Sequence, residues 1–202
     1  YEITTDLIGP LSFPQTSSII VDASQLGMEL RVELPRPIKP ILHVSEEITS
    51  SREVIPLAPL DGGAFSFSAW VKCTETVTGH PRIFEFDLKG DSSYKDNLIL
   101  KFSQADGETN PKMTYMVYHS ETYCGISTSH AYPLNTWVLV HLIHRADTSV
   151  SIYWDGVETG SRASCLILPR VVENRRWVLN GYSKFPMKSV AFFNGEANFQ
   201  TL

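Results

Sequence analysis

The chain of 202 residues has only three cysteines and no long apolar run, and its excess charge is negative. So few cysteines exclude a disulfide-dense scaffold. No apolar stretch approaches the ~20 residues of a membrane span, so we expect no direct membrane insertion. The net charge of −5 argues against nucleic acid as a partner, because non-specific binding needs clustered Lys and Arg.

Several short motifs that carry chemistry are also missing. The sequence has no C-x-x-C pair for zinc, no G-x-S-x-G elbow for a nucleophilic serine and no glycine-rich phosphate loop. His141 and His144 are three apart in an expected strand and so point to opposite faces, which excludes one shared metal. No Asn-x-Ser/Thr acceptor is present, so glycosylation gives no support for secretion.

Cys73, Cys124 and Cys165 allow at most one internal disulfide. A bridge between Cys73 and Cys124, both near expected strand ends, is one arrangement, and three buried thiols are another. The sequence leaves the choice open. It therefore leaves the compartment open as well, because disulfides persist in oxidising compartments.

The first 60 residues are rich in proline. Seven of the twelve prolines lie there, including "PRPIKP" (Pro35 to Pro40), which cannot continue a helix or sit in a central strand. Between prolines, "MELRVEL" (28–34) alternates apolar and polar residues, which indicates a half-buried strand. We expect residues 1–60 to form an extended arm with one or two strands. It would lie at an edge of the main sheet or lead in from an upstream domain.

From residue 61 onward the sequence reads as a series of short strands. "AFSFSAWVKC" (64–73), "NLILKFS" (97–103) and "MTYMVYH" (113–119) each place apolar or aromatic residues on one face. "TWVLVHLIHR" (136–145) is apolar on both faces, which predicts a central strand. "SVSIYW" then meets Asp155-Gly156, a dipeptide that tolerates the positive φ of a tight hairpin. With "RRWVLNGY" and "MKSVAFF" following, the pattern predicts an all-β, antiparallel β-sandwich.

The order of these motifs resembles the laminin G-like branch of the concanavalin A-like lectin/glucanase superfamily. The stretches that carry the likeness are "FSFSAWVK", "RIFEFDLKGD", "YPLNTWVLVHLIHRADTSVSIYWDGV", "RWVLNGY" and "KSVAFF", with Trp70, Trp137, Tyr153, Asp155, Gly156 and Gly181 at matching positions. The likeness covers about residues 60–195 and implies a jelly-roll sandwich over residues 61–202. Lys188 and Ser189 depart from the family pattern, where acidic residues are common.

This superfamily includes glycan binders, protein-binding adhesion modules, pentraxin-like calcium proteins, glycosidases and intracellular scaffolds. The resemblance implies a non-enzymatic recognition or adhesion module that binds a glycan or a protein partner. A structural domain that packs against neighbouring subunits is the alternative, and a glycoside hydrolase is a third reading. The chain opens "YEITTDLIGP", without an initiator Met or a signal peptide. We therefore expect a piece of a larger extracellular or cell-surface protein with neighbouring domains; an intracellular scaffold is also compatible.

The stretch "RIFEFDLKGD" (82–91) places Glu85 and Asp87 on one face of a strand, about 6.6 Å apart. Glycosidases of the superfamily carry E-x-D-x-x-E, and Gly90 stands here where the second Glu belongs. A retaining hydrolase needs a nucleophile and a separate acid about 5–5.5 Å apart. The missing Glu argues against hydrolysis and for a charged sheet face formed by Glu85, Asp87 and Lys89.

A calcium site is a further reading of the same region. Domains of the laminin G-like branch often hold Ca²⁺ at the rim of the sandwich, and calcium takes oxygen ligands. "DLKGDSSYKDN" (87–97) offers Asp87, Asp91, Asp96 and Asn97 around one turn. A polar loop that is simply solvated, its acids neutralised by nearby lysines, is the alternative.

Aromatic residues supply the candidate ligand-binding groups, because sugar rings stack on flat aromatic faces. The segment "YHSETYCGISTSHAY" (118–132) contains Tyr118, Tyr123, His130 and Tyr132 among hydroxyl-bearing residues. Loops at the rim of a rigid sandwich are common positions for binding groups. Trp70 is a further candidate, opposite the apolar face of its strand, although it could instead pack beneath the arm or the second layer.

Overall fold

The computed structural model describes residues 39–74, 80–88, 95–104, 110–120, 122–182 and 185–197, and the backbone of 20–21 and 30–31. Within these ranges there is no helix long and apolar enough to cross a membrane. Two compact units form, residues 1–39 with Leu202 and residues 40–201. In the first unit, β1 (Ile20–Val21) and β2 (Leu30–Arg31) pair antiparallel.

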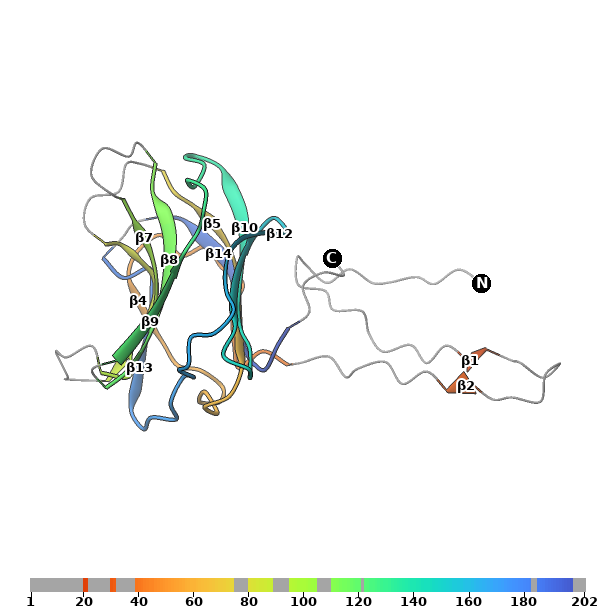
Figure 1. The fold of residues 1–202 in the computed structure, drawn as a ribbon. Coiled ribbons are helices and arrows are strands. Elements are labelled where there is room, and N and C mark those ends of the chain that lie inside the picture. Colours follow the sequence, from red (N-terminus) through yellow and green to blue (C-terminus); the bar gives the residue numbers. More distant parts are fainter. Residues whose placement is uncertain are drawn as a thin grey trace. The chain divides into compact units, whose positions relative to one another are not determined.

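The second unit is built from two antiparallel sheets of six strands each, which face one another in Figure 1. Sheet I contains, in spatial order, β12 (Val157–Arg162), β11 (Val150–Trp154), β10 (Trp137–His144), β5 (Phe65–Lys72), β14 (Met187–Asn194) and β3 (Leu42–Val44). Sheet II contains β4 (Arg52–Val54), β13 (Arg175–Leu179), β6 (Arg82–Leu88), β7 (Leu98–Ser103), β8 (Lys112–His119) and β9 (Thr122–Ser127). The predicted antiparallel sandwich is confirmed.

The core lies between the sheets and follows the alternation of the strands. The inward residues of β5 and of β7 are fully buried, as their period of two predicts. A cluster of phenylalanine rings joins the layers. Phe67 and Phe192 of sheet I contact Phe84 of sheet II, with ring centroids 5.1 and 5.2 Å from it. These contacts fix the two sheets face to face and leave their outward faces as the surfaces of the sandwich.

The β10 strand and the hairpin after it match their sequence patterns. β10 lies between β11 and β5, and His141 and His144 are both buried on its opposite faces. In the turn between β11 and β12, Asp155 and Gly156 have φ values of 48° and 81°. Such positive φ values suit Asp-Gly and place Trp154 opposite Val157.

Two strands from the segment expected to be an arm lie at the sheet edges. β3 pairs with β14 at one edge of sheet I, and β4 pairs with β13 at one edge of sheet II. An edge position was one of the two predicted for this segment. The second unit begins at Pro40. The division of the protein at residue 60 stays a prediction.

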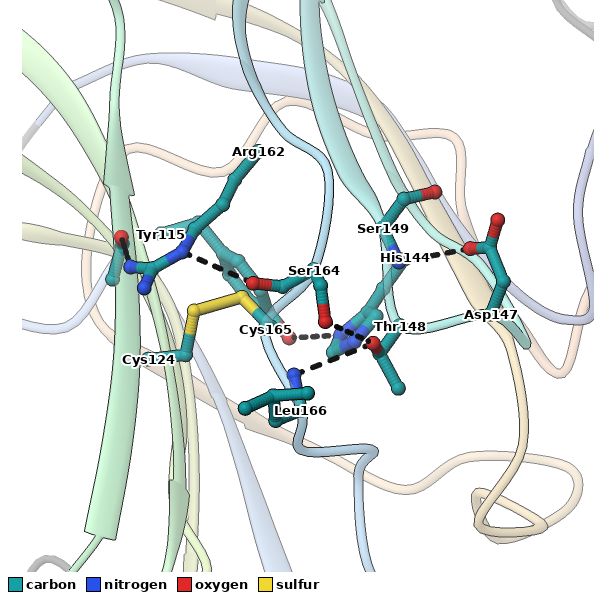
Figure 2. Close-up of a disulfide and its surroundings, with 11 residues drawn as sticks. Tyr115, Cys124, His144, Asp147, Thr148, Ser149, Arg162, Ser164, Cys165 and Leu166 are labelled. Atoms are coloured by element: carbon teal, nitrogen blue, oxygen red, sulfur yellow. Dashed lines mark hydrogen bonds between the residues drawn. A yellow bond between two sulfur atoms is a disulfide. The ribbon is translucent and has the colours of Figure 1, made fainter.

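A disulfide joins the other pair of edges, where β9 of sheet II lies beside β12 of sheet I (Figure 2). Cys124 of β9 is bonded to Cys165, with their Cα atoms 5.4 Å apart. The bridge considered between Cys73 and Cys124 is therefore wrong, because Cys73 ends a central strand and its side chain is buried in the core. Arg162 reinforces the seam by donating to the Gly125 carbonyl at 3.1 Å.

Candidate functional site

The outward face of sheet II gathers polar and aromatic side chains from β6, β7, β8 and β9. We call it the sheet II face, and we define it by three rows of outward residues that the strand register sets side by side. These rows are Arg82–Lys101–Thr114–Ser127, Glu85–Ile99–Met116–Gly125 and, from β8 and β9 alone, Tyr118–Tyr123. Since the opposite side chains of each strand fill the core, the register alone determines which groups this face presents.

A pair of stacked tyrosines ends this face at β8 and β9. Tyr118 and Tyr123 lie directly opposite one another in the register, with ring centroids 5.4 Å apart and planes inclined by 28°. Cross-strand aromatic pairs of this kind stabilise a sheet surface. The Tyr123 side chain is nevertheless 59% exposed. The pair therefore presents a flat aromatic surface to solvent, as stacking against a sugar ring requires.

Hydroxyl groups line the sheet beyond the tyrosines. The Thr114 hydroxyl lies 2.7 Å from that of Ser103 and 2.9 Å from that of Ser127. Gly125 stands between Tyr123 and Ser127 along β9, and a Cβ there would find no atom closer than 3.8 Å. The missing side chain leaves a gap in the face between the aromatic pair and the hydroxyl row. Ring stacking and hydrogen bonding are thus both available on one surface.

The two carboxylates of β6 are each paired with an arginine. Glu85 and Asp87 point outward and are 7% and 6% exposed. Arg82 forms an ion pair with Glu85, and the Nε of Arg176 donates to Asp87 at 2.9 Å. Burial raises the pKa of Glu85, and the Arg82 guanidinium partly offsets this rise. The expected charged sheet face is present at these positions, while Lys89 and Gly90 lie outside the described residues.

Positive charge gathers beside Glu85 at the end of β6 and β7. Arg82 and Lys101 are direct cross-strand partners, and the Arg82 guanidinium lies over the ring of Tyr182, 5.6 Å from its centroid. Burial and, after it, the charge of Arg82 lower the pKa of Lys101. The charge of Lys101 is also the main cause of a lowered pKa at His80, ahead of burial and Arg82. The positive charges of Arg82 and Lys101 therefore lower the pKa values of the basic groups beside them.

The predicted calcium ligands are partly described, and the described acids have arginine partners. Arg176 holds Asp87, and Arg170 donates to the Asp96 carboxylate at 3.1 Å. Asn97 is buried. Asp91 lies outside the described residues. Across the described ranges, no group of three or more His, Cys, Asp and Glu side chains could hold a metal. Calcium stays a prediction.

The other candidate ligand-binding residues do not gather with the tyrosine pair. Tyr132 is wrong as a surface contact, since its ring is fully buried and its hydroxyl donates to the Val71 carbonyl at 2.8 Å. His130 is exposed and shares a hydrogen bond of 2.9 Å with the neighbouring Ser129 hydroxyl. Trp70 is half-buried on the outward face of sheet I, opposite Leu139 and Lys188 in the register.

Sequence reasoning missed the residues that complete the sheet II face, above all Arg82, Lys101, Thr114 and Ser127. Their strands were expected, but their pairing was not. The signal lies in the register: aligning "RIFEFDL" antiparallel with "LILKFS" brings Arg82 and Lys101 face to face. A single strand pattern shows which face a residue occupies, and only the pairing shows its neighbours.

Comparison with solved structures places the same architecture in larger proteins. The binding domain of botulinum neurotoxin serotype G aligns at 17% identity with a TM-score of 0.53, covering 75% of this chain and 40% of that one. The K499G mutant of NanB sialidase from Streptococcus pneumoniae aligns at 12% identity with a TM-score of 0.64, covering 82% and 28%. This chain thus spans less than half the length of either. At such identities the likeness concerns the fold alone.

No curated protein sequence matches the chain. A family model does, over residues 48–196, and this is Laminin_G_3, described as the concanavalin A-like lectin/glucanases superfamily. The match covers most of the sandwich, from the segment before β4 to the residues after β14. The chain belongs to the laminin G-like branch of the concanavalin A-like lectin/glucanase superfamily.

Proposed function

We propose that the protein is a non-enzymatic recognition module that binds a glycan on the sheet II face, at the Tyr118–Tyr123 pair. The observation that carries the proposal is the exposed, stacked pair beside a row of hydroxyl groups. One sugar ring would stack on Tyr123, and the hydroxyls of a second sugar unit, beyond the gap at Gly125, would meet Thr114 and Ser127. Binding proteins commonly combine an apolar surface with a few placed polar groups in this way.

The similar folds support recognition as the general function. The solved structures include a neurotoxin's binding domain and a sialidase, and the family takes its name from lectins and glucanases. Because this chain spans only a part of those proteins, their activities do not transfer as a whole. That the ligand is a glycan is a more specific proposal than recognition in general, and it is based on the Tyr118–Tyr123 pair.

We favour binding over hydrolysis because each carboxylate of β6 has an arginine partner. Glu85 pairs with Arg82 and Asp87 with Arg176. A glycosidase needs one carboxylate as nucleophile or base and a second, protonated carboxyl as acid, on either side of the scissile bond. Two adjacent carboxylates on one strand, each in an ion pair, suit a structural role in the sheet face better.

The disulfide supports an extracellular or cell-surface location. Cys124 and Cys165 are bonded, and disulfides form and persist mainly in oxidising compartments. The module would then meet glycans of the cell surface or matrix, in a larger protein whose other domains are its neighbours. Measuring free thiols in the purified secreted protein tests this: one reactive thiol after denaturation is expected, and three would contradict it.

Binding is tested with a glycan array and then by titration calorimetry on the best ligand. Tyr123→Ala should weaken binding at least tenfold, because it removes the apolar surface that a sugar ring would cover, and burying a large apolar side chain contributes about 1.5–3 kcal/mol. Tyr123→Phe should keep most of the affinity, since it keeps the ring. Val157→Ala is the matched control: it also removes exposed apolar surface, but from β12 of sheet I. Unchanged binding by Tyr123→Ala would overturn the assignment of the site.

An assembly function is the second candidate, and exposed apolar side chains after β4 favour it. Ile55 and Leu57 are 90% and 84% exposed. Large apolar residues exposed close together can mark protein contacts. If they do so here, the protein should self-associate or bind a neighbouring domain, and Ile55→Ser with Leu57→Ser should abolish that association. Sedimentation velocity on both proteins distinguishes this from glycan binding, which the double variant should leave unchanged.

A further inference from the structure

A cation without a carboxylate partner lies at the end of β6 and β7. Arg82 and Lys101 face one another across these two strands. Arg82 forms an ion pair with Glu85, and Arg176 forms one with Asp87, whereas Lys101 forms no ion pair within the described part of the chain. The positive charge of Lys101 is therefore not offset by a contacting carboxylate among the described residues.

The position of Lys101 makes its positive charge unfavourable in the protein alone. Its direct cross-strand partner is Arg82, and like charges placed directly opposite destabilise a sheet. The side chain is also half-buried, and it shares the neighbourhood of His80. A partly desolvated ammonium group facing a guanidinium gains most from an anion that contacts both.

The same row of the face supplies groups that suit a sugar. Lys101 lies opposite Thr114, and Thr114 lies opposite Ser127, so that the cationic pair continues into the hydroxyl row. Thr114 and Tyr118 are four residues apart on β8, or about 14 Å along a strand. That span exceeds one sugar ring. A ligand that contacts both the cations and the tyrosines must therefore be an oligosaccharide with an anionic group some distance from the stacked ring.

We infer that Lys101 and Arg82 form a subsite for the anionic group of an acidic oligosaccharide, a carboxylate or a sulfate ester, whose neutral part occupies the Tyr118–Tyr123 pair. This inference rests on the proposed glycan function and narrows its ligand class. Lys101 would donate hydrogen bonds to the anion, and the Arg82 guanidinium on the adjacent strand, which is held by Glu85, would add to the positive charge beside it. Specificity for charge would come from this subsite and general sugar affinity from the tyrosines.

The test is a glycan array that holds each oligosaccharide in neutral, uronate-containing and sulfated forms, read at about 0.15 M salt so that weak long-range attraction is screened. The wild-type protein should bind the acidic forms about two- to fivefold better than the neutral ones, the size expected for one ion pair near a surface. Lys101→Gln should abolish this preference while leaving the neutral forms bound. Lys188→Gln is the matched control, since it removes the same charge from β14 of sheet I.

Stability gives a second readout. Because Lys101→Gln removes a cation that faces Arg82, we expect its melting midpoint to equal or exceed that of the wild-type protein without ligand. A lysine kept for structural reasons would instead lower the midpoint when removed. A lowered midpoint would therefore count against the inference.

The outcomes separate the two proposals. Equal binding of neutral and acidic forms, or a preference that survives Lys101→Gln, would overturn the anionic subsite and leave glycan binding intact, provided that Tyr123→Ala still weakens it at least tenfold. Failure to bind any glycan would overturn both. An NMR titration with glucuronic acid and with inorganic sulfate distinguishes the source of the anion. Shifts at the Lys101 and Thr114 amides with sulfate alone would mark a general anion site and overturn the glycan assignment.

Discussion

The outward faces of the two sheets differ in the side chains that they present. On sheet I, one part of the outward face is covered: Ser66, Ser68, Ala191 and Phe193 of β5 and β14 have no exposed surface, whereas Trp70 and Lys188 further along these strands are half-buried. On sheet II, the outward residues form ion pairs, a hydroxyl row and a tyrosine pair, and Tyr123 is largely exposed. The two outward faces thus differ at these positions: the part of sheet I around Ser66 and Phe193 is packed, and sheet II presents exposed aromatic and hydroxyl groups.

The contrast between the two outward faces indicates where a ligand site can lie in a sandwich whose sheets have similar strand patterns. Both sheets send apolar side chains inward, so the inward pattern reports the fold and little else. The outward residues decide which face can meet a ligand. A face whose residues are buried serves packing, whereas exposed aromatics beside unpaired charge serve recognition. The predictions below test this contrast.

The largest expected effect concerns the seam that joins the two sheets. Replacing Cys124 and Cys165 together by Ser removes a cross-link between residues 41 apart in sequence. The chain-entropy account of disulfides gives about 4 kcal/mol for a loop of this size. Urea unfolding of both proteins measures the loss, and adding reductant to the double variant should then change nothing. Because Cys124 lies between Tyr123 and Gly125, glycan affinity should fall as well.

A seam that only stabilises the fold would give a different result. The double variant would then lose stability but bind glycan as tightly as the wild-type protein at temperatures where both are folded. That outcome would show that sheet II positions its tyrosines without help from sheet I.

The second prediction compares one aromatic side chain on each outward face. Phe193→Ala on sheet I should cost about 3 kcal/mol of unfolding free energy, because the buried ring leaves a cavity. Tyr123→Ala on sheet II should cost less than about 1 kcal/mol, because its ring is mostly exposed. Denaturant unfolding of both variants gives the values. Similar losses at the two positions would remove the contrast between a packing face and a binding face.

The sequence predicted the inward faces well and the outward faces poorly. The alternation in residues 64–73 places Phe65 and Phe67 in the core, as the structure confirms. The same alternation places Ser66 and Ser68 on the opposite face, and both are fully buried there. The Ser66 hydroxyl, for example, donates to the Gly195 carbonyl at 2.8 Å. The local alternation of apolar and polar residues does not report contacts between residues so far apart in sequence.

The candidate site was predicted in part for the same reason. Tyr118 and Tyr123 lie in adjacent strands of one hairpin, so their pairing follows from local sequence. Tyr132 was misjudged because the segment after β9 turns back into the core, where its backbone N–H donates to the Pro111 carbonyl at 2.7 Å. The Cys124–Cys165 bond and the Arg82–Lys101 pair depend on how strands or sheet edges meet. No local sequence pattern indicates which residue is the partner in either pair.

The third prediction tests the ion pairs that distinguish the sheet II face. Arg82→Leu leaves the buried Glu85 carboxylate without its partner, and we expect a loss of about 2 kcal/mol at pH 7, reduced from the value for a fully buried pair by partial exposure. Burial already raises the pKa of Glu85, and losing Arg82 raises it further. A raised folded pKa means that stability is lost as pH rises, so the penalty should be smaller near pH 4 than at pH 7.

Urea unfolding at both pH values measures this penalty. Arg52→Leu is the control, since it removes an arginine from an exposed ion pair with Glu46 at the edge of the same sheet, and should change stability little at either pH. A penalty for Arg82→Leu that does not depend on pH would mean that Glu85 is not the group left unpaired.

The smallest expected effect uses two histidines of β10 to test whether the outward face of sheet I is closed. His144 points into the core, with its Nδ1 3.1 Å from the Tyr115 hydroxyl, and His141 points outward. Burial lowers the pKa of each to about 4. Since the unfolded state then binds protons that the folded state does not, stability falls as pH drops below the ordinary histidine pKa of about 6.5. Between pH 7 and 5.5 we expect a loss of about 1 kcal/mol for each histidine.

Proton NMR of the imidazole resonances follows the two titrations separately. His141→Gln and His144→Gln should each remove the part of the pH dependence of stability that the replaced histidine causes. If His141 titrates near 6.5 while His144 does not, the outward face of sheet I is open to solvent. The contrast between the sheets would then rest on the chemistry of their side chains rather than on burial, and Trp70 on that face would again compete with Tyr123 as the position where a ligand stacks.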